Sequence, residues 1–248
     1  MKNNTITALE NTWLKKSTKM ASELLDNKKH YIEQGTTLDF ITIFGVIHNH
    51  SNIKLAYEQG VWYIYNPHWT IKKTKREEKI YEKAINFMLQ WEGGYVNHPN
   101  DKGGATNKGV TTATYNAYRD SKNLSRQSVR YITDAEVAEI YRTRYWDASK
   151  CNVIAERSGN LAIAHFDWAV NAGVSRAVST LQGCLETTPD GIWGKITQYA
   201  WETCNPSEVL NCYLQRREYL YRVWGQGSQA VFLTGWINRL NSLKQELA

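Results

Sequence analysis

The sequence predicts an α+β protein in two parts: a small β domain over residues 1–74 and a mainly α-helical region over residues 75–248. Short runs of branched and aromatic residues dominate the first part, whereas apolar residues recur every three or four positions in the second. The segment between them, residues 70–79, is almost entirely charged or polar, which is typical of a linker that leads into a helix. We therefore place the boundary near residue 74.

Three apolar runs predict the strands of the first part: FITIFGVI at 40–47, NIKLAY at 52–57 and VWYIYN at 61–66. The last two runs are separated by EQG, a break of hairpin length that contains a glycine. On a continuous strand, His48 and His50 would face the same side. Because no third ligand lies nearby in the sequence, we interpret them as ordinary surface or loop histidines and expect no metal site.

The second part begins with a predicted helix at 76–92, which ends at the pair Gly93-Gly94. Thr133 and Glu136 form a capping-box pattern that predicts a helix at 134–146. Further helices are expected near 161–172, 175–186, 194–203, 206–223 and 229–246.

Composition limits the classes of partner. The formal charge is 30 − 24 = +6, and 10 Trp and 15 Tyr stand against 5 Phe, which favours a polyanionic or polysaccharide partner. Neither a recognition helix nor an aromatic sheet motif points to nucleic acid. No apolar run is long enough to span a membrane, and the first residues lack the apolar core of a secretory signal. The four cysteines form no CxxC pair, so we interpret them as reduced core residues.

Glu92 is the first candidate for chemistry. It is expected in the last turn of the 76–92 helix, where the helix dipole carries partial negative charge, and its neighbour Trp91 would help to exclude water. Both effects penalise an ionised carboxylate and favour the protonated form that a general acid needs. From position alone, a solvated glutamate before a glycine cap is the alternative.

A polar, glycine-rich loop follows, YVNHPNDKGGATNKGVT, and it is too long for a simple helix connection. It contains Asp101, nine positions after Glu92. A pair of carboxyl groups across a cleft is what a glycosidase requires, one to protonate the leaving oxygen and one to activate water or attack the sugar. Asp101 could instead be a turn residue that bonds its own backbone.

The segment WEGGYVNHPNDKGGATNKGVT resembles the catalytic segment of glycoside hydrolase family 108, the lysozyme-like N-acetylmuramidases found among phage endolysins and bacterial wall enzymes. The resemblance continues in order through YRTRYWDASK, FDWAVNAGVSRAVSTLQ, PDGIWGKIT and FLTGWINRL, and so covers residues 80–248. It implies a lysozyme-like catalytic domain over 75–248, within which about 166–248 is similar to a peptidoglycan-binding helical unit. Lys195 stands where such units often have proline.

The resemblance implies that Glu92 is the general acid. Related phage lysozymes follow their glutamate with an aspartate nine positions on and a threonine six positions later. Asp101 fits that spacing, but position 107 is asparagine and the threonine is Thr106, one place early. Asp101 is therefore the expected second carboxylate, and Thr106 or Asn107 would hold the attacking water unless both only shape the loop.

Three further residues are candidates for substrate binding. Tyr95 either stacks against a sugar or packs within the fold. Asp167 lies between two aromatic residues of an apolar helix, where an aspartate is usually satisfied by amides or a cation, with substrate contact as the alternative. Asn171 either lines the cleft or belongs to the end of that helix.

The predicted function is thus peptidoglycan hydrolysis at the β-1,4 bond between N-acetylmuramic acid and N-acetylglucosamine. We expect no metal or organic cofactor and a monomer without nucleic-acid or integral-membrane contact. The first domain resembles SH3-like modules found beside wall hydrolases, through TWLKKST and WYIYNPHW. Without an export signal, the chain would wait in the host cytoplasm until it is released to the wall. A lytic transglycosylase and a non-catalytic wall-binding protein are the alternatives.

Overall fold

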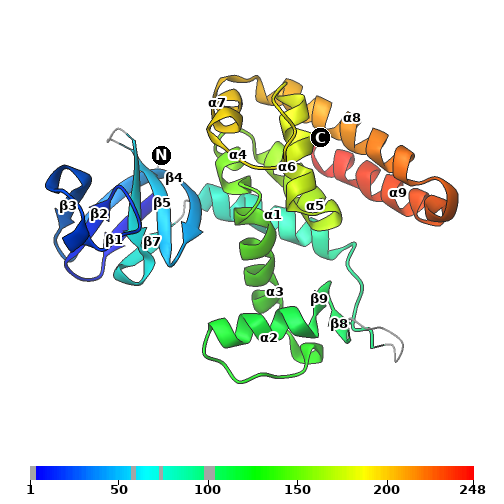
Figure 1. The fold of residues 1–248 in the computed structure, drawn as a ribbon. Helices are drawn as coiled ribbons and strands as arrows, with labels where there is room; N and C mark the ends of the chain where they lie inside the picture. Colours follow the sequence, from blue (N-terminus) through cyan, green and yellow to red (C-terminus); the bar gives the residue numbers. More distant parts are fainter. Residues whose placement is uncertain (1–3, 57–59, 73–74, 98–103) are drawn as a thin grey trace. The chain divides into compact units, whose positions relative to one another are not determined.

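The computed structural model describes residues 4–56, 60–72, 75–97 and 104–248, and it divides into two compact units. The first unit comprises residues 1–80 together with 150–157, and the second comprises 81–149 and 158–248. Antiparallel strands fill the first unit and helices dominate the second (Figure 1). The predicted α+β fold class is therefore confirmed. No helix of the described residues combines the length and the apolarity needed to cross a membrane.

The first unit is built on a seven-stranded antiparallel sheet with the order β3-β2-β6-β5-β4-β1-β7. The predicted hairpin exists, because β5 pairs with β6 along five registered positions from His50↔Tyr65 to Lys54↔Val61. Alternate residues of the strands point to one face and form the core, as strand geometry requires. The strands are β1 (Asn4–Ala8), β2 (Thr12–Lys15), β3 (Lys29–Ile32), β4 (Thr37–Ile47), β5 (His50–Leu55), β6 (Val61–Tyr65) and β7 (Trp69–Lys72).

His48 does not belong to a strand. It and Asn49 form a two-residue turn with φ of 47° and 60°, the left-handed geometry that joins hairpin strands with the correct twist. His50 lies on β5, is 8% exposed, and its Nε2 is 2.9 Å from Nζ of Lys15. The interpretation as surface or loop histidines therefore holds for His48, whereas His50 is buried in the sheet.

One helix of the first unit comes from far along the chain. Helix α4 (Cys151–Arg157) packs on β4, where Nδ2 of Asn152 donates to the carbonyl of Ile43 at 2.7 Å. The limits 1–74 and 75–248 were drawn from composition along the chain. Such limits cannot include helix α4, whose Asn152 lies 109 residues after its partner Ile43.

The second unit begins within α1 (Lys75–Leu89) and is helical except for a small hairpin of β8 (Thr106–Asn107) and β9 (Val110–Thr111). Helices α8 and α9 lie side by side as a hairpin (Figure 1). Tyr81, Trp146 and Phe166 form an edge-on aromatic cluster in the core, with centroids 5.2–5.8 Å apart. The helices are α2 (Thr112–Ser121), α3 (Asp134–Tyr141), α5 (Gly159–Ala172), α6 (Val174–Cys184), α7 (Lys195–Thr203), α8 (Pro206–Trp224) and α9 (Ala230–Glu246).

The predicted capping box is present at the start of α3, but the helix expected at 134–146 is α-helical only to Tyr141 and continues as a π-helix over Arg142–Asp147. A second correction concerns the cysteines. Cys184 of α6 and Cys212 of α8 form a disulfide, with Cα atoms 5.8 Å apart, while Cys151 and Cys204 remain thiols. Their spacing of 28 residues gave no sign of this pairing, which depends on two helices that pack together.

The DGIWGKIT pattern at 190–197, part of the segment similar to a peptidoglycan-binding unit, has a structural explanation. Gln182 donates from Nε2 to Oδ1 of Asp190 at 2.7 Å and to Oγ1 of Thr197 at 3.0 Å, while its Oε1 accepts from the amide of Gly191 at 2.8 Å. Gly191 has φ +75°, and a Cβ there would lie 2.8 Å from the carbonyl oxygen of Ser175. The pattern therefore holds the loop between α6 and α7 in one conformation.

Candidate active site

Glu92 lies just beyond α1, three residues after the last helical residue. The chain leaves the helix through a tighter turn, in which the amide of Trp91 donates to the carbonyl of Met88 at 3.0 Å. The prediction that the helix includes Glu92 is therefore wrong by one turn, because the helix unwinds before the two glycines. Trp91 is 37% exposed and the Glu92 side chain 21% exposed, so the carboxylate remains accessible to a ligand.

The β8–β9 hairpin brings its turn against the Glu92 carboxylate. Lys108 and Gly109 form a two-residue turn with φ of 50° and 73°, and the amide of Lys108 donates to the carbonyl of Gly93 at 3.1 Å. A Cβ at Gly109 would overlap Oη of Tyr141 and would lie 2.7 Å from Oε2 of Glu92. Glycine is required here for two reasons: the backbone is left-handed, and there is no room for a side chain.

Arg239 of α9 connects Glu92 to a buried charged cluster. Its Nη1 lies 3.5 Å from Oε1 of Glu92, whereas its Nη2 and Nε donate to Oδ1 of Asp167 at 2.7 and 3.0 Å. Arg217 of α8 donates to the other oxygen of Asp167. Both oxygens of Asp167 therefore accept from arginines. This placement leaves Asp167, whose side chain is 1% exposed, no surface to offer a ligand.

The hydrogen-bond network continues from Arg217 to a second predicted site residue. Nη2 of Arg217 donates to Oη of Tyr221 at 3.0 Å, and that hydroxyl donates to Oδ1 of Asn171 at 2.8 Å. Asn171 is exposed at the end of α5. Six residues therefore form one continuous chain of contacts, which we call the buried cluster: Glu92, Arg239, Asp167, Arg217, Tyr221 and Asn171.

The two arginines of the buried cluster keep Asp167 ionised. Burial raises the pKa of Asp167, but the charges of Arg217 and Arg239 outweigh burial and hold the pKa below its usual value. Among the described residues of the cluster, two guanidinium groups then face two carboxyl groups, so the cluster is neutral when Glu92 is ionised.

Tyr141 closes the other side of Glu92. Its hydroxyl donates to the carbonyl of Lys108 at 3.1 Å. Burial, and next the negative charge of Glu92, raise the pKa of Tyr141, so the phenol stays protonated at neutral pH. Glu92 thus lies between a neutral phenol and a permanent cation.

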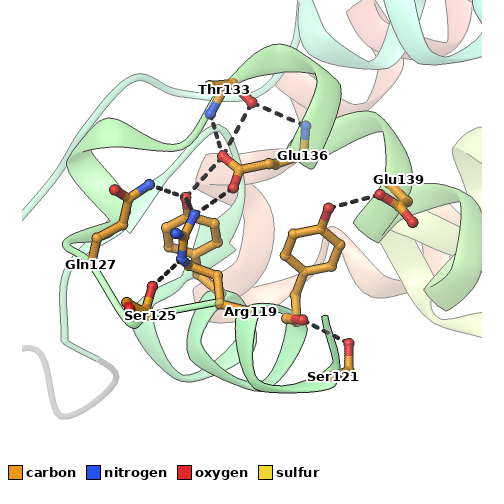
Figure 2. Close-up of polar contacts among 9 residues, drawn as sticks. Arg119, Ser121, Ser125, Gln127, Thr133, Glu136 and Glu139 are labelled. Carbon is orange, nitrogen blue, oxygen red and sulfur yellow. Dashed lines mark hydrogen bonds and ion pairs between the residues drawn. The ribbon is translucent and has the colours of Figure 1, made fainter. Parts of the chain in front are cut away.

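A second network braces the helices that present Tyr141 (Figure 2). Glu136 of α3 accepts from Nη1 of Arg119 and from Oη of Tyr115, both at 2.8 Å, and from the amide of Thr133 at 3.0 Å. Gln127 donates to the same Tyr115 hydroxyl. We call these residues the α2–α3 brace. The brace fixes the start of α3, and Tyr141 is the last residue of that helix.

The remaining predicted site residues lie on or near the hairpin. Thr106 is half-buried on β8, and its backbone pairs with Val96. Asn107 is 7% exposed, and its Nδ2 donates to the carbonyls of Val129 and Arg130 at 3.2 and 3.1 Å. Tyr95 lies under the guanidinium of Arg130 at 4.2 Å. Asp101 lies outside the described residues.

Sequence reasoning missed Arg239, Arg217, Tyr141 and Gly109. The Asn-Lys-Gly-Val segment at 107–110 carries a short hairpin signal that could have located Gly109. The two arginines lie within helices that otherwise show apolar periodicity on their buried faces, and a positive charge at such a position requires a partner. The sequence does not identify that partner.

Comparison with known proteins agrees with this geometry. Residues 85–173 match the family model described as Glycosyl hydrolase 108, a family of glycoside hydrolases. The match includes Glu92, Tyr141 and Asp167, and it confirms the family resemblance over that range. Arg217 and Arg239 lie beyond it.

The chain is also similar to the solved structure of Brucella abortus SagA. The two share 29% sequence identity with a TM-score of 0.55, over 68% of this chain and 94% of that chain. No curated protein matches the chain.

Proposed function

We propose that the protein is an N-acetylmuramidase that hydrolyses the β-1,4 bond between N-acetylmuramic acid and N-acetylglucosamine in peptidoglycan. The observation that carries the proposal is the position of Glu92. It is the accessible carboxyl of the buried cluster and lies within the glycosyl hydrolase 108 match. Resemblance to wall hydrolases supports the choice of peptidoglycan as the substrate, and the charge of +6 suits an anionic wall polymer.

In the proposed reaction Glu92 gives its proton to the glycosidic oxygen as the bond to the anomeric carbon breaks. Negative charge develops on Glu92 in that step, and Arg239 at 3.5 Å stabilises it. A water oxygen completes hydrolysis by bonding to the anomeric carbon, and a second carboxylate takes the water proton or first attacks the sugar itself. We propose Asp101 for this role on its sequence spacing, with Thr106 or Asn107 near the water.

The experiment is product analysis of digested peptidoglycan by mass spectrometry. Hydrolysis gives a reducing muramic acid end, whereas a 1,6-anhydro end would identify a lytic transglycosylase and contradict the proposal. We expect Glu92→Gln to lower the rate by about 100-fold or more, as loss of a general acid does. The matched control is Glu82→Gln, an exposed glutamate of α1, which should cleave like the wild type. Equal cleavage by Glu92→Gln and wild type would remove Glu92 from the mechanism.

The biological setting is part of the same proposal. An endolysin that waits in the host cytoplasm and acts after release to the wall fits the sequence features described above. The first unit would then bind the wall. Part of its aromatic segment WYIYNPHW is not available to a ligand, because Trp69 is 5% exposed and belongs to the core. Added salt should weaken lysis, since it screens attraction between the basic protein and anionic wall polymers.

A further inference from the structure

One flank of α9 leads away from the Glu92 site. Four residues of α9 follow one another at spacings of three, one and three positions, which places them on the same side of the helix. They are Phe232, Gly235, Trp236 and Arg239. Arg239 at one end contacts Glu92. Phe232, seven residues earlier, lies about 10 Å from Arg239 along the helix axis. This flank is therefore continuous with the proposed active site and within reach of a short glycan strand.

The far end of the flank is an exposed aromatic platform. Phe232 is 52% exposed and stacks on Trp236, with centroids 6.0 Å apart and ring planes 23° apart. Trp236 stacks in turn on Tyr221 at 5.5 Å and 19°. Tyr221 is fully buried and held by the hydrogen bonds of the buried cluster. The stack is thus anchored in the core, so Phe232 presents a preformed apolar surface to solvent.

Gly235 leaves the space beside the platform open. A Cβ built on it would have no heavy atom of the described residues within 4 Å, whereas a Cβ on Gly225 would lie 2.8 Å from Leu233. The fold therefore does not require glycine at 235. Glycine weakens a helix interior relative to alanine, so its presence favours a reason outside the fold itself. Close approach of a ligand to the helix backbone is such a reason.

We propose that the flank of α9 bearing Phe232, Gly235 and Trp236 is a subsite for an N-acetylhexosamine ring of the peptidoglycan glycan strand, next to the sugars cleaved at Glu92. The subsite rests on the proposed function, because it takes its ligand from the same substrate. The apolar face of a pyranose ring packs on the Phe232–Trp236 platform. The absence of a side chain at Gly235 allows the ring to approach the backbone.

The test measures binding of purified glycan strands, freed of peptides by an amidase, to the full chain carrying Glu92→Gln so that the ligand is not cleaved. In that background we expect Phe232→Ala to weaken binding at least about five-fold. Gly235→Gln should also weaken binding by filling the open space, while its thermal midpoint should not fall. The matched control is Tyr219→Ala, which removes a 67% exposed aromatic from α8 and should bind like the parent.

Unchanged binding by Phe232→Ala overturns the subsite, as does equal weakening by Tyr219→Ala or a parent that binds no glycan. Weaker binding of Phe232→Ala to anionic lipid vesicles, with glycan binding intact, would assign the flank to a membrane surface instead. Product analysis of the wild type keeps the two proposals apart. If the wild type cleaves but Phe232→Ala binds normally, only the subsite fails. If the wild type does not cleave, the proposed function fails.

Discussion

The two arginine–carboxylate networks of the second unit differ in how far they reach along the sequence. The α2–α3 brace joins Arg119 to Glu136, 17 residues apart, and both side chains are 14% exposed. The buried cluster joins Asp167 to Arg217 and Arg239, 50 and 72 residues away, with Asp167 1% exposed. Both networks use a tyrosine hydroxyl as an additional partner.

The two networks also differ in how their charges are paired. In the brace, Glu136 has its countercharge on Arg119 and its capping contacts at Thr133, both within 17 residues. In the buried cluster, Asp167 faces two arginines, and the remaining positive charge lies against Glu92. A network closed within the fold stabilises it, whereas a network that ends at an accessible carboxyl group can influence chemistry. Gly109 and the hydroxyl of Tyr141 lie beside Glu92 at the accessible end of the buried cluster.

The largest effect should follow from Asp167→Asn. The change leaves the buried cation Arg217 without its carboxylate, and breaking a buried pair in this way costs about 3–5 kcal/mol. Urea denaturation of the purified variant measures this cost. The control is Asp120→Asn, which breaks the exposed pair with Arg126 and should leave the midpoint nearly unchanged. Equal midpoints for Asp167→Asn and wild type would show that the buried cluster does not stabilise the fold.

A second test concerns His165, which lies two residues before Asp167 on α5 and is buried without charge. Burial lowers its pKa to about 4, and its ring contacts the Ser149 carbonyl and the Tyr213 hydroxyl. The unfolded chain, with a His pKa near 6.5, binds the proton first as the pH falls. The stabilisation that comes from a neutral His165 is therefore complete above about pH 6.5. As the pH falls to about 4, the free energy of unfolding should decrease by about 3 kcal/mol.

Denaturation midpoints across that pH range measure the loss, and His165→Gln should remove most of the dependence. Below about pH 4, the dependence of stability on pH comes instead from protonation of carboxylates. The pKa values of Asp167 and Glu136 are both held low against burial, by arginines at Asp167 and by hydrogen bonds and Arg119 at Glu136. Their contribution to stability is present above the pKa values of the unfolded chain. It disappears as the pH falls through the lower pKa values of the folded protein. A wild type equally stable at pH 7 and pH 4.5 would contradict the role given to His165.

Gly109→Ala should disturb the surroundings of Glu92. The left-handed backbone alone costs about 1–2 kcal/mol for a residue with a side chain, and the overlap with Tyr141 and Glu92 adds to it. We expect a lower thermal midpoint and, at a temperature where the variant is folded, a loss of peptidoglycan cleavage larger than the loss of stability explains. Gly94→Ala is the control, because its Cβ has no described neighbour within 4 Å. Full cleavage by folded Gly109→Ala would show that Glu92 tolerates displacement.

The smallest effect is expected for Glu136→Gln in the α2–α3 brace. The amide keeps the shape of the side chain but loses the charge-assisted bond from Arg119, at a cost of about 1–2 kcal/mol. Cleavage at saturating substrate should stay close to wild type, because the brace acts on Glu92 only through the position of Tyr141. A loss of activity as large as that of Glu92→Gln would instead place the brace within the catalytic machinery.

Features of short range were predictable from the sequence. The Thr133–Glu136 capping box, the β5–β6 hairpin and the helices of the second unit depend on residues within one or two turns of each other. Glu92 was identified in the same way, from a helix end and a polar loop. Errors at this range concern the ends of elements, such as the π-helix after Tyr141 and the early end of α1 before Glu92.

Features of long range were not predictable. The partners of Arg217 and Arg239, the Cys184–Cys212 disulfide and the packing of α4 on β4 join residues that are 28 to 109 positions apart. Nothing in local spacing selects these pairs. Each is chosen because folding removes water from both partners at once, so a charge or a polar group must accept the neighbour that packing provides.

The sequence by itself determined the order of a sheet domain and a helical domain, and it identified Glu92 as a candidate acid. It could do so because hydrogen-bond periodicity and capping act over a few residues. Only the tertiary structure decided what surrounds that carboxyl, with Arg239 on one side and Tyr141 and Gly109 on the other. The physical reason is that the electrostatic environment of a side chain depends on distance in space and on burial, and neither can be read from position along the chain.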